Sequence, residues 1–163
     1  GSLGSVAVNN AVRSILPQLL QKFQIIHLCG KGNIDESFAG TPGYVQYEYI
    51  KQELADLFAL ADVVVSRAGA NAICELLELR KPALLIPLSA AASRGDQILN
   101  AKSFKKQGFS DMLEEEQITP DLLLEKITSL FDNRQTYITA MEKSSSSDAV
   151  STIVSLIETT ISK

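Results

Sequence analysis

Apolar residues along this chain follow two alternating patterns. Short continuous apolar runs are typical of buried strands, and they alternate with longer segments in which apolar residues recur at the spacing of a helix. The predicted strands are residues 24–29, 44–49, 62–65, 83–87 and 110–113. The predicted helices are residues 6–23, interrupted near Pro17, then 52–60, 70–79, 96–107 and most of the chain after 122.

This alternation indicates an α/β fold in which helices connect parallel strands. We therefore expect a Rossmann-like, doubly wound parallel sheet, with ligands gathering at the carboxyl ends of its strands. Gly108 is expected to end a helix, and Thr119 to cap a helix that starts with Pro120. The polar run 143–149 is expected to be a loop. Residues 1–163 should form one domain, helical from about residue 119.

Composition narrows the functional classes. The net charge of −4 argues against a general nucleic-acid binder, which normally has a basic face. Cys29 and Cys74 lie in apolar contexts and are expected to be buried, reduced thiols. His27 is the only histidine and lies in an apolar run, which leaves little material for a histidine-based metal site or a catalytic triad. No apolar run reaches the length of about 20 residues that spans a membrane, and no signal peptide is visible.

Three segments rich in small and polar residues follow or precede these elements, and the first is "GSLGS", residues 1–5. Small residues let a backbone approach a ligand closely, and the free N–H groups of the helix that follows attract phosphate. The alternative is that this stretch is a flexible or tag-derived end.

The second segment is "SRAGAN", residues 66–71, between a predicted strand and a helix. Gly69 permits a positive φ or a close approach, and unpaired N–H groups at the helix start favour a diphosphate. Glu75 lies about one turn into the helix, where a carboxylate can accept hydrogen bonds from ribose hydroxyls. In the alternative interpretation Asn71 is a helix cap and Glu75 is a surface residue.

The third segment is "SRGDQILN", residues 93–100. Its Asp, Gln and Asn side chains suit sugar hydroxyls, and Arg94 could meet a phosphate or a neighbouring carboxylate. The alternative is a polar loop in which Asp96 merely caps a helix.

Taken together, "GSLGS", "ADVVVSRAGANAICELLELRKPALLIPL" and "SRGDQILNA" resemble the C-terminal half of the MurG family, in glycosyltransferase family 28. The resemblance covers essentially the whole chain, and "SRGDQILNA" is similar to Gram-positive members. These bacterial enzymes transfer N-acetylglucosamine from UDP-N-acetylglucosamine to lipid I, making lipid II for peptidoglycan. The family fold, GT-B, has two Rossmann-like domains facing across a cleft, and the C-terminal one holds the donor.

The resemblance implies a donor site without cofactor or metal ion. Its residues would be Ser2, Leu3 and Gly4 at the diphosphate, Ile50 at the uracil, Glu75 at the ribose, Asp96 and Gln97 at the sugar hydroxyls, and Arg67, Gly69 and Asn71 around the phosphate loop. It also implies an inverting displacement with UDP as the leaving group, at the cytoplasmic face of the bacterial membrane. The absence of an Asp-x-Asp cluster agrees with a metal-independent reaction.

Two features of the family are missing from this chain: the strand before the glycine-rich loop, and the N-terminal domain. That strand is central to the family's sheet, so we expect a central gap that exposes apolar faces and unpaired backbone. The lipid I site, the catalytic base and the main membrane-facing patch would lie in the missing domain, so no catalytic residue is assigned and the chain alone is expected to be inactive.

Two other functions stay open at this stage. The chain could be a non-catalytic half that docks on a membrane subunit, as in the related eukaryotic transferase. It could also be a UDP-sugar epimerase, although such enzymes need acid and base groups beside the sugar and the sequence offers few.

Overall fold

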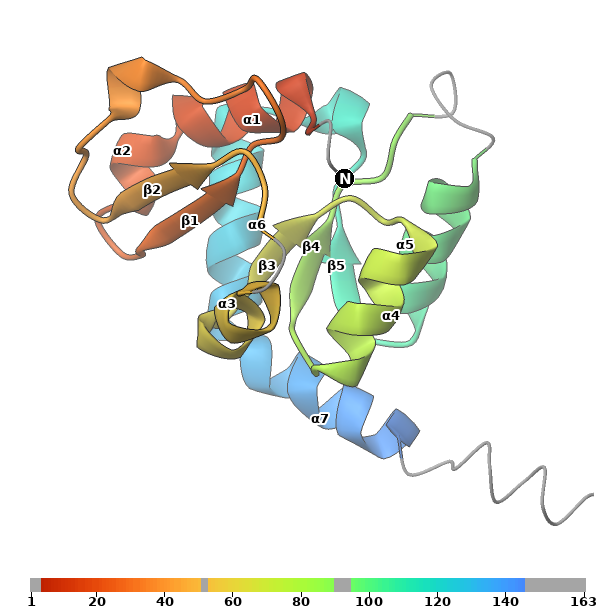
Figure 1. The fold of residues 1–163 in the computed structure, drawn as a ribbon. Helices are drawn as coiled ribbons and strands as arrows, with labels where there is room; N and C mark the ends of the chain where they lie inside the picture. Colours follow the sequence, from red (N-terminus) through yellow and green to blue (C-terminus); the bar gives the residue numbers. More distant parts are fainter. Residues whose placement is uncertain (1–3, 51–52, 90–94, 146–163) are drawn as a thin grey trace, which may run out of the picture.

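The computed structural model describes residues 4–50, 53–89 and 95–145, which form an α/β fold (Figure 1). The strands are β1 (Ile25–Leu28), β2 (Tyr44–Tyr47), β3 (Val64–Ser66), β4 (Ala83–Leu85) and β5 (Ser110–Met112). The helices are α1 (Val6–Ser14), α2 (Leu16–Leu19), α3 (Leu54–Leu60), α4 (Ala70–Glu78), α5 (Asp96–Lys106), α6 (Pro120–Asp132) and α7 (Arg134–Ser145), with short 3-10 turns η1 (Glu36–Phe38) and η2 (Glu115–Gln117). The predicted alternation of strands and helices is confirmed, and most boundaries agree within two residues. The first helical segment ends at Leu19 rather than 23, and α7 continues to Ser145, so the expectation of a loop is wrong for residues 143–145. The prediction for residues 146–163 lies outside the described residues.

All strand pairs are parallel, but the strands form two separate sheets. β1 pairs with β2, with Ile25 opposite Tyr44, and β3, β4 and β5 form the second sheet in that order. Within the described residues β1 is not paired with β3, so the sheet has a gap between these two strands, as expected from the sequence.

Local signals explain where several helices begin and end. α1 stops at Ser14, and Pro17 lies in the first turn of α2, where its missing N–H would have no helical partner. Thr119 accepts a hydrogen bond from the backbone N–H of Leu122, and Pro120 is the first residue of α6, as predicted. Gly108 has φ of +76° after α5, which confirms the predicted stop.

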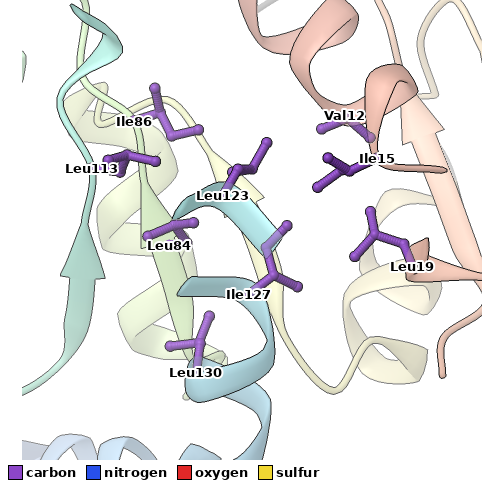
Figure 2. Close-up of a cluster of buried hydrophobic side chains, with 9 residues drawn as sticks. All are labelled: Val12, Ile15, Leu19, Leu84, Ile86, Leu113, Leu123, Ile127 and Leu130. Atoms are coloured by element: carbon purple, nitrogen blue, oxygen red, sulfur yellow. The ribbon is translucent and has the colours of Figure 1, made fainter. Parts of the chain in front are cut away.

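The main core lies on one face of the three-stranded sheet. α6 lies between this sheet and the two N-terminal helices, so that its side chains contact both (Figure 2). The buried members are Val12, Ile15, Leu19, Leu84, Ile86, Leu113, Leu123, Ile127 and Leu130. Burying these side chains holds the start of the chain against the sheet.

A second core covers the opposite face of the same sheet. Ala83 and Leu85 point into it from β4, while Leu84 points into the main core, as the two-residue period of a strand requires. Ile73 and Leu76 from α4 and Ala101 from α5 complete this second core. Helices on both faces make the fold doubly wound, as predicted.

The two-stranded sheet has one covered and one exposed face. His27 and Tyr44 point toward α1 and are buried. The alternate residues form an apolar outer face with partial exposure: Ile26 39%, Leu28 40%, Val45 40% and Tyr47 42%. This matches the expected exposure of apolar faces in the sheet.

Two smaller findings concern the cysteines and membrane spans. Cys29 is buried as predicted, but Cys74 is exposed because it lies on the outer side of α4, so the expectation of two buried thiols is wrong for Cys74. None of the helices in the described ranges has the length and apolar character needed to cross a bilayer.

Candidate functional site

The segments singled out in the sequence follow the carboxyl ends of strands or precede helices at that end of the sheet. Parallel strands end on the same edge, so the start of α1, the turn after β3 and the start of α5 lie on one side of the molecule (Figure 1). Whether they form one site depends on the side chains that connect them.

Arg67 is the residue that connects them most directly. Its Nη1 donates to the carbonyl oxygens of Ile86, at 3.2 Å, and Pro87, at 3.1 Å, just beyond β4. Its Nη2 donates to Ser5 Oγ before α1 and forms an ion pair with Glu115 in η2. The side chain is 19% exposed, so these partners occupy a largely desolvated guanidinium. Arg67 therefore joins three strand ends to the turn before α1.

The turn before α1 is held by Gly4 and Ser5. Ser5 is the N-cap of α1, and its hydroxyl accepts a hydrogen bond from the backbone N–H of Val8 at 3.3 Å. Gly4 has φ of +68°, and a Cβ there would lie 2.0 Å from the carbonyl oxygen of Cys29. Only glycine allows this close contact between the turn and the end of β1. Ser2 and Leu3 lie outside the described residues.

The turn between β3 and α4 ends at Gly69, the N-cap of α4. Its φ is −65°, so of the two possibilities that the glycine offers, the positive φ is not used. Nothing lies within 4 Å of the Cβ position of Gly69 among the described residues, which leaves room for a close approach. No side chain in the described part of the protein caps α4, so its first backbone N–H groups keep their capacity to bind an anion.

Asn71 and Glu75 follow on α4. Asn71 is exposed in the first turn, and the alternative in which it caps the helix is wrong because the cap is Gly69. Glu75 is half-buried, flanked by the buried Ile73 and Leu76. In the described part of the chain its carboxylate makes no hydrogen bond or ion pair, so it remains able to accept two hydroxyl groups.

The start of α5 is tied to two strand ends. Gln97 Oε1 accepts a hydrogen bond from the backbone N–H of Leu88 at 3.1 Å, and Asn100 Nδ2 donates to the carbonyl oxygen of Ala68 at 3.1 Å. Asp96 is exposed in the first turn, and the alternative in which it caps the helix is wrong because the cap is Gly95, with φ of +84°. Ser93 and Arg94 lie outside the described residues.

Ile50 is half-buried beyond the end of β2, on the two-stranded sheet. It lies at the carboxyl end of that sheet, but its assignment to the uracil stays a prediction. The same holds for the ligand contacts of every other predicted site residue.

The roles of two groups of residues were not predicted from the sequence. Glu115 pairs with Arg67, but it stands in an acidic run, and no spacing rule links it to a residue so distant in the chain. Asn9, His27 and Tyr44 form a buried hydrogen-bonded chain. The single histidine in an apolar strand was the one available signal.

Among the described residues, no group of three or more His, Cys, Asp or Glu side chains is arranged to hold a metal ion.

Comparison with known families places these observations in a wider context. Residues 1–157 match the model of the glycosyltransferase family 28 C-terminal domain. One curated relative, from Lachnoclostridium phytofermentans, is 61% identical over 158 residues, which is 97% of this chain and 44% of that protein. Another, from Geobacillus thermodenitrificans, is 58% identical over 160 residues, 98% of this chain and 45% of that protein.

Both relatives are named UDP-N-acetylglucosamine–N-acetylmuramyl-(pentapeptide) pyrophosphoryl-undecaprenol N-acetylglucosamine transferase. The chain thus spans less than half the length of these relatives.

Two solved structures have a similar fold. The crystal structure of Acinetobacter baumannii MurG matches with a TM-score of 0.74 and 27% identity, over 98% of this chain and 47% of that one. The glycotransferase of kitacinnamycin matches with a TM-score of 0.73 over 88% of this chain and 36% of that one. At 19% identity the second likeness concerns the fold alone.

Proposed function

Because the chain belongs to the glycosyltransferase family 28 C-terminal domain family, we propose that it binds the donor UDP-N-acetylglucosamine for an N-acetylglucosaminyltransferase. In the whole protein the sugar is transferred to lipid I to give lipid II, at the cytoplasmic face of the bacterial membrane. Relatives that are 54–61% identical carry the name of this transferase, and the MurG crystal structure shares the fold.

The observation that carries the proposal is the set of bonds made by Arg67. They bring the turn before α1, the turn before α4 and the loop after β4 to the same edge of the sheet. Two helix N-termini, those of α1 and α4, then lie near one guanidinium. Backbone N–H groups and the positive ends of helix dipoles favour a diphosphate at such a place, each by about 0.3–1 kcal/mol.

The proposed donor contacts keep the assignments made from the sequence. Ser2, Leu3 and Gly4 bind the diphosphate, and Gly69 and Asn71 shape the loop beside it. Glu75 accepts hydrogen bonds from the ribose, while Asp96 and Gln97 bind the sugar hydroxyls. Ile50 contacts the uracil, and Arg67 holds the phosphate loop through its bonds to Ser5 and Glu115 rather than by touching the ligand.

The proposed chemistry is an inverting displacement at the anomeric carbon. As the bond to the sugar breaks, negative charge develops on the departing UDP, and preorganised loop amides stabilise that charge. Lipid I and the general base belong to the other half of the full-length protein. Residues 1–163 therefore act as one donor-binding domain that by itself transfers nothing.

The ribose assignment is testable with one pair of variants. Glu75→Ala should weaken UDP binding about tenfold, because it removes a carboxylate that accepts charge-assisted hydrogen bonds from two hydroxyls. Glu78→Ala is the matched control, since Glu78 is exposed on the last turn of the same helix. Both affinities are measured by NMR titration of the 163-residue chain with UDP. Equal affinities for the two variants would remove the ribose role of Glu75.

Complementation separates the proposed function from a non-catalytic module and from an epimerase. The chain is mixed with the N-terminal half of a relative's transferase, and transfer of N-acetylglucosamine to lipid I is measured. We expect transfer from the mixture and none from either half alone. Binding of UDP without transfer from the mixture would favour a non-catalytic partner, and a changed sugar configuration without an acceptor would favour an epimerase.

A further inference from the structure

A buried chain of hydrogen bonds joins α1, β1 and β2 beneath the proposed diphosphate site. His27 Nδ1 lies 2.8 Å from the hydroxyl of Tyr44, and His27 Nε2 lies 3.0 Å from Asn9 Oδ1. Asn9 Nδ2 in turn donates to the carbonyl oxygen of Cys29 at 2.8 Å. Asn9 is 4% exposed, Tyr44 7% and His27 9%, so water does not compete for these groups.

The contacts determine which nitrogen of the imidazole carries the proton. Because Asn9 donates through Nδ2 to Cys29, its Oδ1 must be the atom that faces His27. A carbonyl oxygen only accepts, so His27 Nε2 carries the hydrogen. The unprotonated Nδ1 then accepts from the hydroxyl of Tyr44. With the ring neutral and protonated at Nε2, both of its nitrogens and the Tyr44 hydroxyl have a hydrogen-bond partner.

The turn at Gly4 packs directly against this same carbonyl group of Cys29. A Cβ on Gly4 would lie 2.0 Å from this oxygen and 3.0 Å from the Cα of Gly30. Asn9 therefore holds the peptide of Cys29 from one side while the backbone of Gly4 packs against it. The backbone N–H of Asn9 also donates to the carbonyl oxygen of Ser5 at 2.8 Å, in the first turn of α1. One residue thus bonds both the turn and the end of β1.

We propose that His27 is a positioning residue: its neutral ring orients Asn9, and Asn9 sets the separation between the turn at Gly4–Ser5 and the end of β1. This inference rests on the proposed function, because it assigns the turn to the diphosphate of the donor. Changing His27 or Asn9 should affect only the binding of the diphosphate, since neither residue lies on β3 or α4 beside Glu75.

The surroundings of the ring keep it neutral. Burial and the charge of Arg13 on α1 lower the pKa of His27 to about 4. Arg13 donates to the carbonyl oxygen of Asn33 and to Gln46 Oε1 on β2, and these bonds hold its guanidinium near His27. The other ionisable groups nearby are Tyr44, whose pKa burial raises, the Cys29 thiol, and Asp35, whose pKa is lowered by hydrogen bonds from Ser37.

The tautomer is measured directly, because His27 is the only histidine and gives a single pair of ring nitrogens. In the 15N-histidine-labelled chain at pH 7, we expect Nε2 to be protonated and Nδ1 to be unprotonated and hydrogen-bonded. A ring protonated at Nδ1, or on both nitrogens, would overturn the inference.

The positioning role is measured by two ligands that differ only in phosphate. His27→Leu and Asn9→Ala should each weaken UDP binding about tenfold in NMR titrations of the folded chain, while uridine affinity stays unchanged. Leu130→Val is the control, because it loosens the main core on α6 and does not alter the hydrogen-bonded residues Asn9, His27 and Tyr44 or the turn at Gly4–Ser5. A variant that only loses stability would leave both affinities unchanged at a temperature where it is folded.

The remaining outcomes are also decisive. Unchanged UDP affinity in the folded Asn9→Ala chain, or an equal loss of UDP and uridine affinity, contradicts the positioning role. If His27→Leu does not fold, Asn9→Ala and the tautomer still decide the question. If the unaltered chain binds neither UDP nor uridine, the proposed function itself fails. The tautomer measurement needs no ligand, so it still tests the hydrogen-bond geometry separately from that failure.

Discussion

Replacing Gly4 by alanine should lower the free energy of unfolding by about 4 kcal/mol, one of the largest effects available in this chain. The new Cβ would lie 2.0 Å from the carbonyl oxygen of Cys29 and 2.8 Å from its carbonyl carbon. Both are backbone atoms, so neither can rotate away as a side chain would. The φ of +68° adds the steric cost of a left-handed conformation. Urea unfolding followed by circular dichroism measures the change.

Gly32→Ala is the matched control. Gly32 has a similar φ of +73°, but nothing lies within 4 Å of its Cβ position among the described residues. This variant should therefore lose only the cost of the left-handed backbone, about 1–2 kcal/mol. If the two variants lose the same free energy of unfolding, the close packing of Gly4 on Cys29 does not exist in solution.

Acidification from pH 7 to pH 4 should remove about 2–3 kcal/mol from the free energy of unfolding through His27 alone. Burial and Arg13 lower the pKa of His27 from 6.5 to about 4 in the folded chain. Between these two values the unfolded chain binds a proton that the folded chain does not. Stability is therefore complete above pH 6.5 and falls as the pH drops toward 4.

The free energy of unfolding should decrease further below pH 4, for a separate reason. Burial acts to raise the pKa of Asp111, but hydrogen bonds from Lys126 and Lys105 lower it below the usual value of 3.8. This carboxylate stabilises the folded chain above that value, and its contribution is lost as the pH falls further.

The histidine contribution is isolated by His27→Gln, which has no titrating ring. Its free energy of unfolding should be nearly independent of pH between 7 and 5, although its value at pH 7 is lower than that of the unaltered chain. In the unaltered chain, the ring resonance should titrate near pH 4 while the protein is folded. A midpoint near 6.5 in the folded state would show that the imidazole is not shielded as described.

Most of the fold was predictable from local pattern. Apolar runs identified all five strands, and cap residues such as Thr119 and Gly108 identified helix ends, because these signals act over a few residues. The gap between β1 and β3 was expected from the family resemblance and not from local pattern. Whether β1 pairs with β3 depends on which strands lie side by side, and the periodicity of one strand does not contain that information.

The candidate site was predictable in its residue types but not in its connections. The sequence pointed to Arg67 beside a phosphate loop, but its bonds to Ser5, Glu115 and the end of β4 join residues far apart in the chain. At Gly69 the sequence left a positive φ and a close approach open, and the structure, with its negative φ and open Cβ position, leaves the close approach.

The amino-acid order alone settled the succession of strands and helices, the family and the segments that bear small and polar residues. Tertiary structure decided which partners those side chains have within the protein. Gln97 and Asn100 bind backbone groups, Glu75 keeps its carboxylate unpaired within the described residues, and His27 holds a tautomer imposed by Asn9 and Tyr44. The reason is physical: a hydrogen-bond partner is chosen by proximity in space, and buried groups brought together from distant segments have no other partner to choose.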